Sequence, residues 1–230
     1  MDNLIKPFNE LFNYIFPIKG ILSVWGDFGV GKTIFSLQKA MNYKLGKKKI
    51  IYIYTKPNFP FEKINYFIQK SVKNTLDNII FIKSLNFEDL YSLVFNLEFI
   101  VLDTYKKPNT VIDLIIIDSI TDLYRLELNR ESKEKNFLLN YKLNQILANL
   151  FFLNKKYSIN IIVVNTQTNI NQNGQLIEVQ SGGKVMDYWI DNSLKILRTN
   201  KLNCRRFVFK KKSNKKAIES LSTLTQDGFI

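Results

Sequence analysis

The stretch Gly26-Asp27-Phe28-Gly29-Val30-Gly31-Lys32-Thr33 decides the fold of this chain, because it matches the pattern G-x-x-x-x-G-K-[ST]. The apolar run Ile21–Trp25 before it predicts a strand, and Lys32–Leu45 after it predicts a helix that ends at a glycine. In this setting the glycines let the backbone fold around phosphate oxygens, and the helix N-terminus adds a positive dipole. We therefore expect residues 26–33 to bind the phosphates of a nucleotide. A glycine turn with a vestigial lysine is the alternative.

Two side chains of this stretch have distinct expected roles. Lys32 would reach the β- and γ-phosphates, and the hydroxyl of Thr33 would be a ligand of Mg²⁺. Such a site also needs an acidic residue at the end of a buried strand, and Asp118 follows the apolar run Asp113–Ile117. We expect Asp118 to hold Mg²⁺, directly or through water. A turn or helix-capping aspartate is the alternative for Asp118.

Short apolar strands alternate with helices along the rest of the chain. This order predicts an α/β fold with a mostly parallel sheet flanked by helices, built as a P-loop core, with ligands at the carboxyl ends of the strands. The last segments, from residue 193 onward, predict an antiparallel extension. No linker or repeat interrupts residues 1–230, so one domain is expected, with residues 1–20 as an N-terminal segment. The predicted strands are 50–54, 79–82, 161–165, 193–197, 205–211 and 219–224, and the predicted helices are 62–72, 88–96 and 136–156.

The composition narrows the function classes. Hydrophobic residues make up 46% of the 230 residues and no apolar run is long enough to cross a bilayer, so neither a disordered chain nor a membrane protein is expected. The net charge of +13 favours a polyanionic partner such as nucleic acid, although an AT-rich genome could also enrich lysine. Histidine is absent, which excludes histidine-based catalysis and metal sites. The single cysteine, Cys204, fits the reducing cytoplasm.

Three further motifs carry a resemblance to a known family. Residues 117–127, which read Ile-Asp-Ser-Ile-Thr-Asp-Leu-Tyr-Arg-Leu-Glu, resemble the second nucleotide motif of the RecA-type recombinases. Their Leu-Tyr-Arg-Leu-Glu part is most similar to the short archaeal branch called RadB. Residues 163–167 are similar to the V-x-T-N-Q strand end of the family, and residues 182–189 to its Gly-Gly-His-x-x-x-x-Trp stretch.

The resemblance implies a RecA-type ATPase core without a separate N-terminal DNA-binding domain. Proteins of this branch bind ATP, hydrolyse it weakly, bind DNA and are thought to assist the main recombinase in DNA recombination and repair. In the family, a glutamine at the position of Gln167 senses the γ-phosphate and couples it to a DNA-contacting loop. That loop would be residues 168–180 here, and an earlier one would be residues 128–137. The candidates for contact with single-stranded DNA, within these segments or just before the earlier one, are Arg125, Arg130, Asn169 and Asn171. Ordinary surface loops are the alternative for both segments.

The sequence departs from this family at the catalytic base. The family carries a glutamate just after the strand that follows the P-loop helix, and Lys56 stands at that position here. A protonated lysine accepts no proton, and Glu62 comes several residues later, so ATP binding with very slow hydrolysis is expected. Lys32 and Gln167 remain the catalytic candidates. Three alternatives remain for Lys56. It stabilises the negative charge of the phosphates, or it is a plain surface lysine. In the third, the alignment with the family is off by one residue, so that Lys56 is not at the position of the base.

Two further departures lie elsewhere. Lys184 stands where this branch often has histidine, and Phe8-Asn9-Glu10-Leu11 lacks the alanine of the family's Phe-x-x-Ala oligomerisation motif. Filament formation is therefore less expected than for a full recombinase.

Positive charge is concentrated in the predicted C-terminal hairpin. Its members Arg205, Arg206, Lys210, Lys211 and Lys212 are candidates for contact with the DNA backbone at one edge of the sheet. The rival interpretation is a solvated basic edge that blocks unwanted strand pairing. The aromatic residues that alternate with these charges fit core packing better than base stacking.

Two rival functions complete the expectations. One is a nucleotide-gated interaction protein that docks on a recombinase or polymerase without acting on DNA. The other is a RecA-fold regulatory ATPase similar to the KaiC group, which the Leu-Tyr-Arg-Leu-Glu stretch disfavours.

Overall fold

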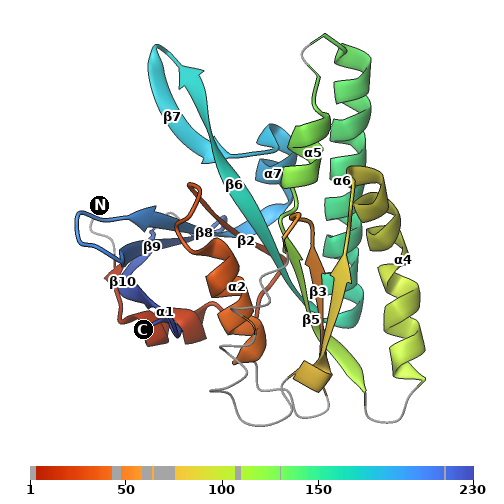
Figure 1. Ribbon diagram of the computed structural model, residues 1–230, viewed down its shortest axis with the longest axis horizontal. Coiled ribbons are helices and arrows are strands. Elements are labelled where there is room, and N and C mark those ends of the chain that lie inside the picture. Colours follow the sequence, from red (N-terminus) through yellow and green to blue (C-terminus); the bar gives the residue numbers. More distant parts are fainter. Residues whose placement is uncertain are drawn as a thin grey trace.

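A computed structural model describes residues 4–42, 48–58, 64, 76–106, 110–129, 131–214 and 216–230 (Figure 1). None of the helices in these ranges is long and apolar enough to cross a bilayer. The first half contains β1 (Leu4–Ile5), α1 (Phe8–Tyr14), β2 (Ile21–Gly26), α2 (Lys32–Met41), β3 (Lys48–Tyr54), η1 (Leu76–Asn78), β4 (Ile79–Lys83), α4 (Phe87–Tyr105) and β5 (Val111–Asp118). The second half contains α5 (Asp122–Glu127), α6 (Lys133–Tyr157), β6 (Asn160–Gln172), β7 (Gln175–Gln180), α7 (Gly183–Trp189), β8 (Ile190–Arg198), β9 (Cys204–Lys211), β10 (Ile218–Thr225) and β11 (Gly228–Phe229).

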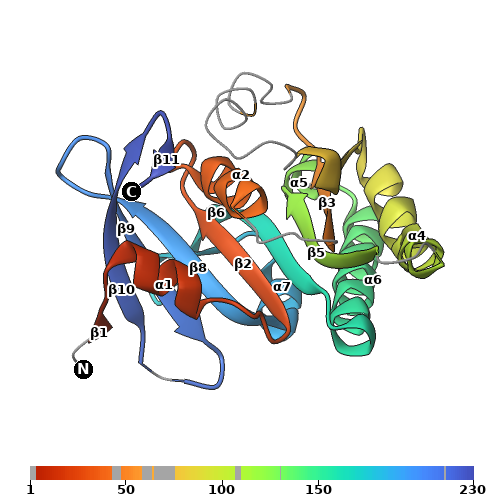
Figure 2. The same ribbon diagram turned by 90° about the horizontal axis from the view of Figure 1, so that it is seen from below.

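The described strands form one sheet in the order β1-β10-β9-β8-β2-β6-β5-β3-β4, with β7 paired to β6 and β11 to β10 (Figure 2). From β8 to β4 every neighbouring pair on this path is parallel, whereas β9 is antiparallel to both β8 and β10. The predicted mostly parallel sheet with an antiparallel C-terminal extension is confirmed. The carboxyl ends of β2, β3, β5 and β6 therefore meet at one edge, where ligands bind in such sheets.

Helices cover both faces of the parallel strands, and β5 shows why. Its side chains alternate, so that Leu114 and Ile116 belong to the core beneath α1 and α2, and Ile115 and Ile117 to the core beneath α4 and α6. All four are fully buried. A strand buried on both faces reads as a continuous apolar run, which is the pattern that predicted it.

Two elements extend beyond their predicted bounds. Helix α4 was expected over residues 88–96 but continues to Tyr105, because Leu97 and Val101 keep the helical spacing and are buried. Strand β6 was expected to end at residue 165 but runs to Gln172, well past the core. The predicted helix over residues 62–72 lies outside the described residues, except for Ile64, which is buried in the core beneath α2.

The basic strand β9 is not at an edge of the sheet. It lies between β8 and β10, with Arg206 paired to Leu197 on one side and to Leu221 on the other. The expectation that these residues form an edge of the sheet is therefore wrong, and their contact with DNA stays a prediction. Phe207 and Phe209 are buried in the core, as expected from their alternation with charged residues.

Helix α1 packs on this antiparallel part of the sheet. The ring of Phe8 lies 4.9 Å from that of Phe207 and 5.9 Å from that of Phe229, between ring centroids. Phe8 and Leu11 are both buried. The segment Phe8–Leu11, which lacks the alanine of the oligomerisation motif, thus packs into the core of its own chain.

Candidate functional site

The P-loop connects β2 to α2 at the carboxyl edge of the sheet. Gly26 and Gly31 have φ angles of 149° and 104°, which an L side chain rarely adopts. A Cβ on Gly26 would lie 2.3 Å from the carbonyl oxygen of Ile196, so the loop needs glycine there for close backbone approach as well. Val30 is buried beneath the loop, whereas Phe28 at its tip is 89% exposed. The backbone of residues 26–33 is therefore held in a curved form.

The ammonium of Lys32 lies within this curve. Its Nζ donates to the carbonyl oxygen of Gly26 at 2.9 Å and to that of Asp27 at 2.6 Å. Lys32 is only 7% exposed. Burial, and secondarily the positive charge of Lys56, lower the pKa of Lys32 to about 8. The lysine is therefore charged at neutral pH and held at the place where phosphate oxygens are expected.

Asp118 ends β5 beside the P-loop and is fully buried. Its Oδ2 accepts a hydrogen bond from the hydroxyl of Tyr52 at 3.1 Å, and that hydroxyl also contacts Ser36 Oγ at 2.8 Å. Burial and the Asp118 charge raise the pKa of Tyr52, so its hydroxyl stays protonated and can donate. Thr55 accepts from Ser119 N at 2.8 Å and donates to Ser119 O at 2.9 Å. These bonds fix the carboxylate against the end of β3.

Lys56 joins the two halves of the site. Its Nζ donates to Thr33 Oγ1 at 2.9 Å and lies 3.0 Å from Asp118 Oδ1. Within the described residues Asp118 Oδ1 accepts no hydrogen bond, and the ammonium of Lys56 is the cation in ion-pair contact with it. The interpretation of Lys56 as a plain surface residue is wrong, because its ammonium contacts both side chains that the sequence assigned to Mg²⁺.

Mg²⁺ and this position of Lys56 exclude one another. Mg²⁺ binds oxygen at about 2.0–2.1 Å and requires near-octahedral geometry. A metal ion bound to Thr33 Oγ1 and Asp118 Oδ1 would occupy the space between them, where Lys56 Nζ lies 2.9 Å from the first and 3.0 Å from the second. The residues present therefore do not fit a Mg²⁺ ion while the ammonium of Lys56 holds this place.

Gln167 stands next to the P-loop, at the base of a hairpin formed by β6 and β7. The preceding Thr166 is the register partner of Gly26 across the parallel strands β6 and β2. The side chain of Gln167 hydrogen-bonds to Glu178 of β7, whose carboxylate accepts from Lys195 Nζ at 2.6 Å. The Lys195 bond is the main cause of the lowered pKa of Glu178.

Side-chain contacts also join β2 to β8 and to the base of this hairpin. The ammonium of Lys195 lies 4.6 Å from the ring centroid of Trp25, and the indole of Trp25 donates to Ser193 Oγ at 2.7 Å. Ser23 of β2 also hydrogen-bonds to Gln180 at the end of β7. The strand that enters the P-loop therefore contacts the base of the hairpin directly.

The expected DNA loop over residues 168–180 is an ordered antiparallel hairpin. It is paired from Gln167↔Gln180 to Gln172↔Gln175 and projects beyond the rest of the sheet (Figure 1). Its polar composition predicted a loop. The segment forms strands nevertheless, because β6 and β7 pair with each other and do not depend on burial in the core. The earlier expected loop, residues 128–137, is also shorter than predicted, since α6 begins at Lys133.

The hairpin separates the candidate DNA residues. Asn169 and Asn171 lie on the same face as Gln167, because side chains alternate along a strand. Arg125 lies toward the other face, where its Nη1 donates to Thr166 Oγ1 at 2.9 Å.

On that face Arg125 lines a pocket of about 480 Å³. Its other lining residues include Thr168, Gly182, Gly183 and Lys184. Arg130, the fourth candidate, lies outside the described residues.

The five C-terminal candidates do not form one cluster either. Arg205 and Arg206 lie at the start of β9, and Lys210 and Lys211 at its end. Neighbouring residues point to opposite faces of the sheet. Lys211 lies over the ring of Tyr14, 4.6 Å from its centroid, and Lys212 donates to the carbonyl oxygens of Asp187 and Tyr188 at 3.1 and 2.8 Å. Both lysines thus have structural contacts of their own.

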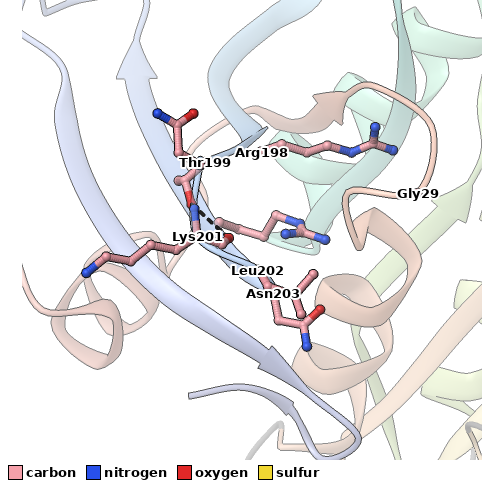
Figure 3. A pocket seen from close by; sticks show the side chains of 8 residues that line it. Gly29, Arg198, Thr199, Lys201, Leu202 and Asn203 are labelled. Carbon is pink, nitrogen blue, oxygen red and sulfur yellow. Dashed lines mark hydrogen bonds between the residues drawn. The ribbon is translucent and has the colours of Figure 1, made fainter.

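A pocket of about 430 Å³ adjoins the P-loop and was not foreseen from the sequence (Figure 3). It is bounded by Gly29 and the turn at residues 199–203. Arg198, another of its lining residues, donates to Phe28 O at 2.7 Å. Arg205 also lines it, and its buried Nε has no hydrogen-bond partner within the described residues. Arg198 could have been found as the last residue of a strand parallel to β2.

Comparison with known proteins agrees with this geometry. A sequence model of the family described as Rad51 matches residues 6–218. The chain is 32% identical over 199 residues to the DNA repair and recombination protein RadB of Methanocaldococcus jannaschii, covering 84% of each chain. It is 31% identical over 215 residues to the protein of the same name from Methanococcus maripaludis, covering 92% of this chain and 91% of the relative.

Proposed function

The chain belongs to the Rad51 family as a RadB-like paralogue of the RecA-type recombinases, and on that premise we propose that it is a DNA recombination and repair protein that binds ATP and single-stranded DNA. Its ATP hydrolysis is weak or absent. The observation that carries the nucleotide part of the proposal is the buried ammonium of Lys32, held inside the glycine curve by two backbone carbonyls.

The phosphates of ATP lie in the curve of residues 26–33, with Lys32 turning from the loop carbonyls to the β- and γ-phosphates. The nucleoside half takes the pocket beside Gly29, where Arg198 and Arg205 supply hydrogen-bond donors. The family relation implies Mg²⁺ as the accompanying ion, but Thr33 and Asp118 would be free to bind it only with the ammonium of Lys56 displaced. Lys56 competes for the same two oxygen atoms.

Slow hydrolysis follows from the chemistry of Lys56. A general base must accept a proton from the attacking water, and a charged ammonium has no lone pair to accept it. The ammonium is instead placed to attract phosphate oxygens. Gln167 adjoins the first glycine of the P-loop through Thr166, so it is the residue that would respond to the γ-phosphate.

Single-stranded DNA binds on the Arg125 face of the hairpin. Arg125 and Lys184 provide two positive charges around the pocket at the hairpin base, and Gly182 and Gly183 offer backbone there. Contacts of this kind bind phosphates without reading bases. They are also weakened by salt.

A second candidate function is favoured by one observation, the presence of Lys56 at the position of the catalytic base. Without a base, the protein would act as a nucleotide-gated docking protein for a recombinase or polymerase and would not act on DNA itself. DNA binding separates the two candidates, because only the first requires it.

The test is equilibrium ATP binding by calorimetry beside ATP turnover, each with and without a single-stranded oligonucleotide. Wild type and Lys83→Ala, a control at the end of the neighbouring strand β4, should bind ATP with little turnover. Lys32→Ala should bind ATP at least about tenfold more weakly. Lys56→Glu should gain turnover.

Two results would contradict different parts of the proposal, one its slow hydrolysis and the other its binding of DNA. Rapid DNA-stimulated turnover by wild type would show that a base acts despite Lys56. Absence of oligonucleotide binding at low salt would exclude direct action on DNA and leave the docking function.

A further inference from the structure

The ammonium of Lys56 stands where a P-loop site of this family would hold a cation. It contacts Thr33 Oγ1 at 2.9 Å and Asp118 Oδ1 at 3.0 Å, the two atoms expected to bind the metal ion. A lysine ammonium carries one positive charge and three N–H donors. One of these donors is directed to Thr33 and the ammonium also faces Asp118, which leaves one donor for a phosphate oxygen in the P-loop.

The position of Lys56 is fixed by its neighbours. The register of the sheet pairs Tyr54 with Asp118, and Thr55 N donates to Asp118 O at 2.9 Å. Thr55 is also hydrogen-bonded to the backbone of Ser119 on both its donor and acceptor sides. Lys56 therefore leaves the end of β3 directly beside the carboxylate and does not reach it from a distant loop.

The carboxylate in turn needs a cation. Asp118 is fully buried, and an unpaired charge in such a place is strongly unfavourable. Tyr52 bonds to Oδ2 but is neutral, so it orients the carboxylate without balancing the charge. Lys56 is the cation that lies against Oδ1 among the described residues.

We propose that the ammonium of Lys56 replaces the divalent cation of this site, so that the protein binds ATP without Mg²⁺. This inference rests on the proposed ATP binding and specifies which ion accompanies the nucleotide. One positive charge from Lys56 and one from Lys32 are then available to the phosphates. The loss of the catalytic glutamate and the loss of the metal requirement are two results of the same residue.

The test compares the affinity for ATP, measured by calorimetry in EDTA and in Mg²⁺. Wild type and the control Lys83→Met should bind ATP with affinities that differ by less than about threefold between the two conditions. Lys56→Met should bind weakly in EDTA and at least about tenfold more tightly in Mg²⁺, because its two oxygen ligands are then open to the metal.

A second measurement needs no nucleotide. Mg²⁺ alone should raise the melting temperature of Lys56→Met, whose buried Asp118 has lost its ion pair, and should leave that of wild type unchanged. Wild-type binding that is lost in EDTA and restored by Mg²⁺ would overturn this inference alone. Absence of ATP binding in both conditions would overturn the proposed nucleotide function together with it.

Discussion

The side-chain amide of Gln38 and the backbone of Phe229 exchange two hydrogen bonds. Gln38 Nε2 donates to Phe229 O at 2.8 Å, and Phe229 N donates to Gln38 Oε1 at 2.9 Å. The ring of Phe229 is buried and packs edge-on against Phe207. The C-terminal strand β11 is thereby fastened to α2, the helix that begins at the P-loop lysine.

Replacing Gln38 should therefore weaken both the fold and the nucleotide site. Gln38→Ala leaves the N–H and C=O of Phe229 without these partners, and we expect a loss of about 1–3 kcal/mol in the free energy of unfolding. Urea denaturation measures this loss, and ATP binding by the same variant should fall. Gln226→Ala, at an exposed position near the same end of the chain, should change neither quantity. Equal stability of the two variants would mean that β11 is not fastened through Gln38.

Gly31 should tolerate no side chain. Its φ angle is 104°, and an added Cβ would lie 2.6 Å from Cζ of Phe229. We expect Gly31→Ala to lower the free energy of unfolding by about 2–4 kcal/mol, from backbone strain and overlap together. Gly174→Ala is the matched control, because Gly174 has a φ of 82° and no atom within 4 Å of the added Cβ. It should show the strain alone, at about 1–2 kcal/mol. Similar losses in both variants would contradict the packing of Phe229 against the P-loop.

Lys39 should make stability depend on pH in the alkaline range. Burial lowers the pKa of Lys39 to about 8, and its ammonium lies over the rings of Phe16 and Phe12 at 3.4 and 4.6 Å from their centroids. In the unfolded chain the pKa is about 10.4. Between these values the unfolded state binds more protons, so the contribution of Lys39 to stability rises with pH. Below about pH 8 the buried charge is present in full and lowers stability.

Lys39→Met keeps the apolar stem and removes this charge. At neutral pH we expect it to raise the free energy of unfolding by about 1–2 kcal/mol, since each unit of pKa shift is worth about 1.4 kcal/mol and the two rings offset part of it. The difference from wild type should vanish above about pH 10. Lys201→Met, at an exposed position, should show no such difference. A stabilisation independent of pH would mean that packing, and not charge, is the cause.

Arg125 should contribute one ionic contact to single-stranded DNA. Arg125→Ala should weaken binding and reduce the slope of log affinity against log salt by about 0.7, the value for one phosphate contact on a single strand. Lys212→Ala should leave the slope unchanged, because Lys212 donates to two backbone carbonyls at the end of α7. Fluorescence anisotropy with a labelled oligonucleotide at several salt concentrations measures both. A reduced slope for Lys212→Ala, together with an unchanged slope for Arg125→Ala, would place the DNA on the C-terminal strands.

Local patterns were sufficient to predict the P-loop and the strands around it. The glycines of residues 26–33 need particular φ angles, and a strand buried on both faces, such as β5, is apolar throughout. These signals lie within a few residues of the feature that they indicate. The same holds for Asp118, which directly follows such a strand.

The parts that the sequence did not predict depend on distant partners. Strand β9 is interior because β10 pairs with it, and no feature of β9 itself indicates a second neighbour. The extension of β6 depends on β7, since its polar residues bury nothing on their own. The reach of Lys56 to Asp118 depends on the register of β3 against β5, which is set along the full length of both strands.

The position of Trp25 gives the protein an optical reporter of its own site. The chain has two tryptophans, and only Trp25 lies on β2, one residue before the P-loop. The emission of an indole responds to nearby charge, and here the ammonium of Lys195 lies 4.6 Å from the ring while also binding Glu178 of the hairpin. A movement of the hairpin that shifted Lys195 would change this emission. Intrinsic fluorescence of a Trp189→Phe variant can therefore follow, in real time and without a label, whether nucleotide at the P-loop moves the hairpin.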